Sequence, residues 1–145
     1  MAITTNAICN TFKKELLEAK HNFSNPGGNT FKLAMYTNSA TLGKSTTSFT
    51  TGNEVSSPSG YSSGGKALVN TGTSLATNTA ITDFSDLSFV GVTLTARGAL
   101  IYNDTATGDP AVAVLDFGGD KTASAGTFTI QFPAFTTSAA ILRIA

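Results

Sequence analysis

The chain has 145 residues, a length that suits one domain, and its 9 basic and 9 acidic side chains cancel to a formal net charge of zero. Charged residues make up 12% of the sequence, about half the usual share, and the basic ones are scattered from Lys13 to Arg143, so we expect no nucleic-acid binding. No apolar run approaches the roughly 18 residues of a membrane span, and the N-terminus lacks the basic start and apolar block of a secretory signal.

Hydroxyl side chains dominate the polar composition, with 24 Thr and 14 Ser. Thr favours strands, and both residues supply uncharged polar surface. Because a weakly charged surface repels its neighbours poorly, this composition favours a subunit of an assembly. The single Cys9 cannot form an internal disulfide, which fits synthesis in a cytoplasm.

Helical spacing is clearest near the N-terminus. Apolar residues step by four, four, three and four positions there, which places them on one face of a helix; they are Ile8, Phe12, Leu16, Ala19 and Phe23. We therefore predict an amphipathic helix over residues 6–22, ended by the Asn-Pro-Gly-Gly run at 25–28. This helix is expected to cover one end of the core, and docking on a neighbouring subunit is the alternative.

Residues 30–36 alternate apolar and polar side chains and predict a strand with one apolar face. The following residues 37–65 are mostly Ser, Thr, Gly and Asn, with isolated apolar residues at Leu42, Phe49, Val55 and Tyr61. A loop of this length is usually functional or held by a partner. The spaced apolar residues indicate an ordered excursion that lies on the domain.

Short strand patterns fill the rest of the chain. We expect strands at 66–70, 79–83, 86–90, 98–103, 111–117, 127–132 and 140–144. Residues 92–96 can continue the strand at 86–90 past a bend or bulge at Gly91. The strands from 98 onwards predict an antiparallel meander with polar loops at 104–110 and 118–126. The predicted fold is one all-β domain over residues 1–145, an antiparallel β-sandwich (jelly-roll-like or Ig-like) of about 7–8 strands with one N-terminal α-helix.

Catalytic and metal-binding patterns are weak. His21 is the only histidine, placed in the last turn of the predicted helix, where the helix dipole favours its charged form. We interpret Cys9 as a packing residue. One Cys and one His do not make a zinc site, and nucleophilic catalysis needs a base beside the nucleophile. We expect no enzyme and no cofactor.

Acidic residues cluster in the two loops of the meander, with Asp104 and Asp109 in one and Asp116 and Asp120 around the other. Carboxylates in turns can hold Ca²⁺, but neither loop has the ligand order of an EF-hand. Asp beside Gly ordinarily forms the turn itself, so we assign no metal. Gly118-Gly119 lacks the Lys-Ser or Lys-Thr of a phosphate-binding loop.

The order of segments along nearly the whole chain resembles a family of small virion structural proteins of tailed bacteriophages. The segments that carry this resemblance are TFKKELLEAKHNF, FKLAMYTNSATLGKST, TTGNEVSSPSGYSSGGKAL, TARGALIYND, AVAVLDFGGDKTASAGTFTIQFP and AILRIA. Residues 96–133 are the most specific part. The resemblance carries no catalytic motif.

The resemblance implies a non-enzymatic capsid decoration (cement) protein that bridges and stabilises the shell. It further implies the major capsid protein or other virion subunits as partners, a homo-oligomer (dimer or trimer), synthesis in the host cytoplasm and release by lysis. A tail, baseplate or fibre-base subunit is the first alternative. A carbohydrate-binding module that presents Tyr36, Tyr61 and Tyr102 is the second, although the sequence lacks Trp.

Partner contacts are expected on loops held by a rigid scaffold. The loops are those at 37–65, 104–110 and 118–126, and a flat sheet face is the alternative. The interface candidates within the loops are Phe49, Val55, Tyr61, Asp104, Asp109, Asp120 and Lys121.

Overall fold

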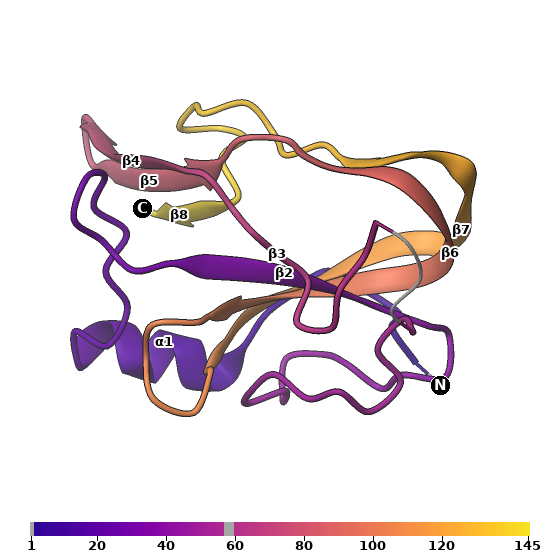
Figure 1. Ribbon diagram of the computed structural model, residues 1–145. Coiled ribbons are helices and arrows are strands. Elements are labelled where there is room, and N and C mark those ends of the chain that lie inside the picture. The colour runs from indigo at the N-terminus through magenta and orange to yellow at the C-terminus, as the bar shows by residue number, and fades with distance from the viewer. Residues whose placement is uncertain (1, 57–59) are drawn as a thin grey trace.

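The structure is a computed structural model that describes residues 2–56 and 60–145 (Figure 1). It contains β1 (Ala7–Ile8), α1 (Asn10–Leu17), β2 (Phe31–Tyr36), β3 (Lys66–Ala67), β4 (Asn70–Ala76), β5 (Thr79–Phe84), β6 (Leu87–Asn103), β7 (Ala111–Ile130) and β8 (Leu142–Ile144). The named strands form a five-stranded sheet in the order β1-β7-β6-β2-β3 and a three-stranded sheet in the order β4-β5-β8. All strand pairs are antiparallel. The predicted all-β sandwich with one N-terminal helix is confirmed.

A single bent hairpin joins the two layers (Figure 1). β6 and β7 pair from Leu87 opposite Ile130 to Tyr102 opposite Ala111, with several register shifts between. Such bulges bend a strand and raise its twist. The hairpin therefore runs beside the three-stranded sheet at one end and lies within the five-stranded sheet at the other.

The predicted meander was wrong in its last part. Residues 118–126, expected to form a loop, lie inside β7. Residues 92–96 continue the strand at 86–90 past a bulge at Gly91, as predicted, and the strand expected at 98–103 belongs to this same strand, β6. Gly118 and Ala125 have φ values of +78° and +47°, a geometry usual in turns but also found in bulges. The polar Gly-rich residues thus bend a continuous strand instead of ending it.

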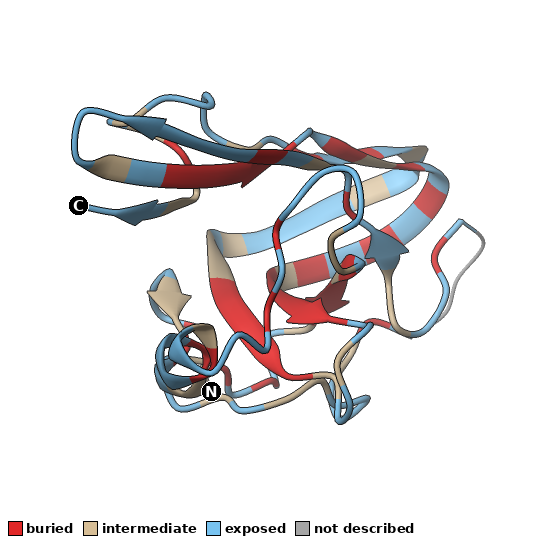
Figure 2. Ribbon diagram, turned by 90° about the vertical axis from the view of Figure 1, so that its left-hand side faces the viewer, coloured by how far each residue is buried: buried red, intermediate tan, exposed pale blue. Residues whose placement is uncertain are grey.

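The loop at 37–65 packs on β2, as its spaced apolar residues predicted. Leu42, Val55 and Tyr61 are buried and Phe49 is partly buried. The Tyr61 hydroxyl accepts a hydrogen bond from the backbone N–H of Met35 (2.9 Å) and donates one to Glu54 (2.7 Å). Residues 57–59 of this loop lie outside the described residues. With the loop in place, β2 is buried on both faces, not on one as expected (Figure 2).

The helix is shorter than the predicted 6–22. Ala7 and Ile8 pair with Val114 and Ala113 as strand β1, and Cys9 holds an extended backbone before the first helical residue. After Leu17 the chain leaves the helix, and Ala19 has a φ of +58°. Phe12 is buried as expected, whereas Ile8 and Leu16 are partly buried and Ala19 is exposed.

Candidate interaction surface

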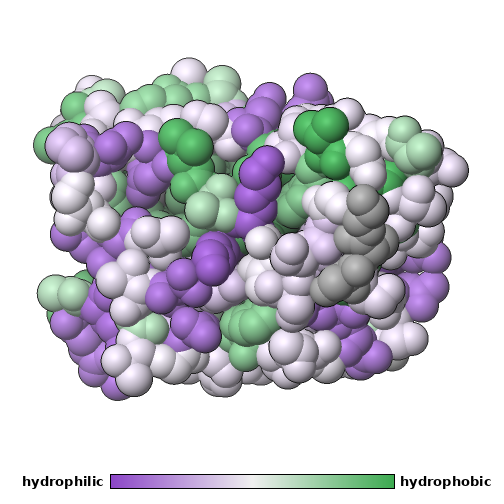
Figure 3. Space-filling model, in the orientation of Figure 1, coloured by the Kyte–Doolittle hydropathy of each residue, from purple (hydrophilic) through white to green (hydrophobic). Residues whose placement is uncertain are grey.

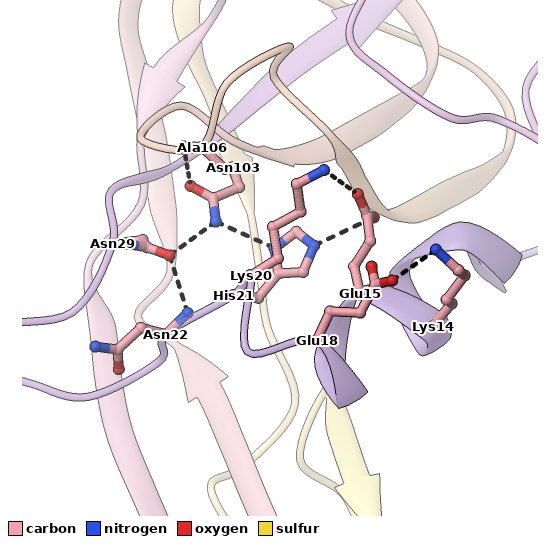
Figure 4. Close-up of polar contacts among 9 residues, drawn as sticks. All are labelled: Lys14, Glu15, Glu18, Lys20, His21, Asn22, Asn29, Asn103 and Ala106. Atoms are coloured by element: carbon pink, nitrogen blue, oxygen red, sulfur yellow. Dashed lines mark hydrogen bonds and ion pairs between the residues drawn. The ribbon is translucent and has the colours of Figure 1, made fainter.

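A buried polar network fixes the segment that follows α1 (Figure 4). His21 lies beyond the helix, where Nε2 is 3.4 Å from Glu15 Oε1 and Nδ1 is 3.1 Å from Asn103 Nδ2. Because an amide NH₂ can only donate, Nδ1 accepts and Nε2 carries the proton. Asn103 also donates to Asn29 Oδ1 (2.9 Å). The expected position of His21 in the last helical turn, with the helix dipole favouring its charge, was wrong.

Two titratable groups in this region, His21 and Cys9, are held in their uncharged forms. Burial lowers the pKa of His21, partly opposed by the hydrogen bond to Glu15. Burial also raises the pKa of the Cys9 thiol to about 11, so the thiol is protonated at neutral pH. A protonated buried thiol is a poor nucleophile. Both residues therefore serve the packing of this end of the domain.

The tyrosines offered for sugar stacking are buried. Tyr36, Tyr61 and Tyr102 are each less than 5% exposed, and burial raises the pKa of all three hydroxyls. Their rings lie inside the sandwich or beneath the 37–65 loop. A sugar ring therefore cannot stack on them, and the carbohydrate-binding alternative loses the residues on which it depended.

The apolar interface candidates of the long loop point inward. Val55 and Tyr61 are 6% and 4% exposed. Phe49 is partly buried and its ring stacks on Tyr102 with a centroid distance of 4.6 Å. These side chains hold the loop to the domain, so they offer little surface to a partner.

The charged interface candidates lie in two places, with Asp104 and Asp109 in the turn between β6 and β7 and Asp120 and Lys121 next to each other on β7. Asp104 forms an ion pair with Lys32 (3.2 Å), and Asp120 accepts a hydrogen bond from Asn38 (3.0 Å). Asp109 is brought near Phe49, whose backbone N–H donates to the Asp109 carbonyl (3.0 Å). Lys121 is exposed on β7 opposite Ala96. Among the described residues no group of three or more His, Cys, Asp or Glu side chains could hold a metal ion.

An apolar groove opens between α1 and the three-stranded sheet. Figure 2 looks onto this end of the molecule, with β8 above and α1 below. The groove has a volume of about 530 Å³. One wall includes Phe12 and Leu16 of α1 and Ile8 of β1, and the opposite wall includes Ile81 and Leu142 of the three-stranded sheet.

Two large apolar side chains next to the groove are exposed. Ile144 lines it and is 64% exposed, and Leu17 is 91% exposed. Leu17 lies about 40° around the helix from Lys13, another lining residue, because each helical residue turns by about 100°. Leu17 is not itself a lining residue, but it lies on the same side of α1 as Lys13. The apolar groove, with these exposed side chains on the elements that form it, is a candidate interaction site.

A second hollow, of about 590 Å³, lies beside β7 and has a more polar lining. The outer edge of β7 is partly capped there. The N–H of Asp116 donates to Asn6 Oδ1 (2.7 Å), and the N–H of Gly118 donates to Asp116 Oδ1 (2.8 Å). Side chains thus occupy two backbone donors that an added strand would need. The groove beside α1 is the better candidate for a partner.

Sequence reasoning missed this groove. Its walls come from residues 8–23, 73–82 and 141–145, which only the fold brings together. One signal was available, because Leu17 follows Leu16 directly and so falls outside the predicted apolar face of the helix.

Comparison with known proteins finds no family model that matches the chain, no similar curated protein and no similar solved structure. No helix in the described part of the chain is long and apolar enough to cross a membrane.

Proposed function

We propose that this chain is a non-enzymatic structural subunit of a tailed-phage virion that binds and stabilises the capsid shell as a decoration (cement) protein. The observation that carries the proposal is the apolar groove between α1 and β8, with Leu17 and Ile144 exposed beside it. The resemblance of the sequence to small phage virion proteins gives the class of assembly. The major capsid protein or another virion subunit is the proposed partner.

Burial of apolar surface would supply the binding energy. Fully burying one Leu or Ile side chain contributes about 1.5–3 kcal/mol, so a groove with two exposed neighbours can hold a partner segment without strong charge pairing. The face drawn in Figure 3 has hydrophobic residues mainly on the side of the three-stranded sheet, above a more hydrophilic middle. Such a subunit would join others as a dimer or trimer, form in the host cytoplasm and leave the cell by lysis.

The copy number of the chain in purified particles tests the position in the virion. Hundreds of copies are expected for a shell protein, and quantitative mass spectrometry of intact particles measures this number. A few to a few dozen copies, or labelling confined to tails, would contradict the capsid role and indicate a tail or baseplate subunit.

Variants test whether the groove makes the contact. Leu17→Asp with Ile144→Asp is expected to weaken binding to assembled heads by more than tenfold, since it places two charges where apolar contact is needed. Val69→Asp with Val90→Asp is the matched control, because these two side chains are 63% and 70% exposed and do not line the groove. Equal loss of head binding in the control would assign the contact to another surface.

A further inference from the structure

The walls of the groove indicate how apolar its occupant must be. Apolar side chains face it from α1, from Phe23 and from the strands β5 and β8. Polar lining comes from Thr73 and Thr82, and the Thr82 hydroxyl already donates to the Gly72 carbonyl (2.7 Å). An occupant must therefore present apolar side chains to most of this surface.

The charged side chains of the groove indicate which charge its occupant should carry. The charged side chains in its lining are Lys13 and Arg143, both exposed. Lys13 forms no hydrogen bond or ion pair with any residue that the structure describes, and Arg143 donates to the uncharged carbonyl of Thr137 (3.0 Å). Among the described residues, the lining thus has two cationic side chains and no acidic one.

The acidic residues of α1 do not compensate these cations. Glu15 lies between Lys20 and His21, with Oε2 3.1 Å from Lys20 Nζ. Glu18 pairs with Lys14 at 2.7 Å. The helix therefore presents an unpaired cation to the groove while its carboxylates are engaged elsewhere.

We infer that the groove binds an acidic, apolar segment of a different protein. A second copy of this chain fits less well, because a two-fold contact sets the same patch against itself and would bring the Lys13 and Arg143 of both copies together. Like charges at an interface disfavour that pairing. Carboxylates on the partner segment would instead face Lys13 and Arg143 while its apolar side chains fill the space between α1 and β8.

Two synthetic peptides serve as probes. Both have 14 residues with Leu at helical three- and four-residue spacing, and the remaining positions are all Glu in one and all Lys in the other. We expect the full chain to bind the Glu peptide about tenfold more tightly than the Lys peptide at low salt, as two exposed ion pairs imply. Calorimetry measures both affinities, and amide chemical shifts should change around α1 and β8. The preference should shrink at high salt.

Reversing the two charges tests whether the preference for the Glu peptide arises at the groove. Lys13→Glu with Arg143→Glu is expected to abolish or invert the preference for the Glu peptide. Lys44→Glu with Lys121→Glu is the matched control, since it changes the net charge equally at exposed sites outside the groove. Equal binding of the two peptides, no binding of the Glu peptide at about 1 mM, or the same loss in the control would overturn the inference.

The inference rests on the proposed function in taking the groove as the docking site, but the peptide experiment needs no particle. A protein that prefers the Glu peptide and does not bind assembled heads contradicts the virion role alone. A charge-reversed protein that loses the peptide preference and binds heads at full strength contradicts the acidic occupant alone.

Discussion

At the scale of single residues, the polar network around His21 is as much a part of the core as its apolar neighbours. The Asn103 side chain is fully buried, and both its amide nitrogen and its amide oxygen form hydrogen bonds. Its Nδ2 donates to His21 and Asn29, and its Oδ1 accepts from the N–H groups of Thr105 and Ala106. Buried amides contribute to stability only when such partners are present. This one residue ties the segment after α1 to the turn between β6 and β7.

The neutral state of His21 predicts acid sensitivity. Its folded pKa is lowered by burial, so the unfolded chain takes up a proton more readily, near the ordinary pKa of about 6.5. The free energy of unfolding should therefore be highest above pH 6.5 and fall as the pH drops below it, by up to about 1.4 kcal/mol per pH unit. Urea unfolding between pH 7.5 and 5.5 measures the slope.

His21→Gln is the control for this slope, because glutamine does not titrate and can still donate a hydrogen bond to Glu15. We expect the variant to be less stable at pH 7.5 but nearly independent of pH in this range. A wild-type protein whose stability is flat between pH 7.5 and 5.5 would contradict the assignment.

At the scale of elements, α1 has one face in the core and one beside the groove. Phe12 is 2% exposed and its ring lies 4.8 Å from His21 and 6.0 Å from Phe23. Leu17, one turn and a half further on, is 91% exposed. The same short helix thus supports the fold through Phe12 and leaves Leu17 exposed, so its expected role in the core is confirmed and its docking role stays a prediction.

Alanine substitution should separate the two faces. Phe12→Ala is expected to lower the free energy of unfolding by about 3–5 kcal/mol, because it removes a buried aromatic ring. Leu17→Ala should change it by less than about 0.5 kcal/mol. Chemical denaturation checks both values. A large loss of stability in Leu17→Ala would mean that this side chain belongs to the core and is unavailable for docking.

The sequence predicted these elements where local pattern and tertiary contact agree. The burial of Phe12, the strand at 31–36 and the apolar anchors of the 37–65 loop follow from spacing alone. The start of the helix could not be predicted from spacing. Ile8 fits the helical spacing, but Ala7 and Ile8 pair with Val114 and Ala113 as a strand. The continuity of β7 could not be predicted either, because Gly-rich residues occur both in bulges and in turns.

At the scale of the whole molecule, the β6–β7 hairpin of the five-stranded sheet reaches toward the three-stranded sheet (Figure 1). The β6–β7 hairpin holds Leu87 and Ile130 at the three-stranded end and Leu100 and Val114 in the five-stranded sheet. Leu100 and Val114 are fully buried, and Leu87 and Ile130 are nearly so. A layer cannot separate without breaking pairs or contacts along this hairpin. The groove arises at the opposite end, where β8 and α1 face each other without a connecting strand.

This arrangement predicts one cooperative unfolding transition. Amides in β5 and in β2 should exchange with the same limiting free energy, close to that of global unfolding, as expected of a single unit. Native-state hydrogen exchange in low denaturant measures both. Exchange of β5 at a clearly lower free energy than β2 would show that the three-stranded sheet opens on its own.

The groove itself was out of reach of sequence reasoning for a physical reason. Each wall reads as an ordinary apolar pattern, and only the fold places Leu16 opposite Leu142 and sets Ile144 beside them. The cations Lys13 and Arg143 are 130 positions apart by their residue numbers. Their common position depends on how the last strand packs, which no local pattern encodes.

The position of the last strand also decides how the protein can be labelled. Ile144 and Ala145 line the groove, whereas the first described residues, which lead into β1, run along the far side of the molecule from β8 (Figure 1). A purification tag or fluorescent protein fused after Ala145 would crowd the groove and compete with its occupant. The same fusion placed before Met1 would leave the groove open, so N-terminal fusions are the form in which binding should be measured and cargo displayed.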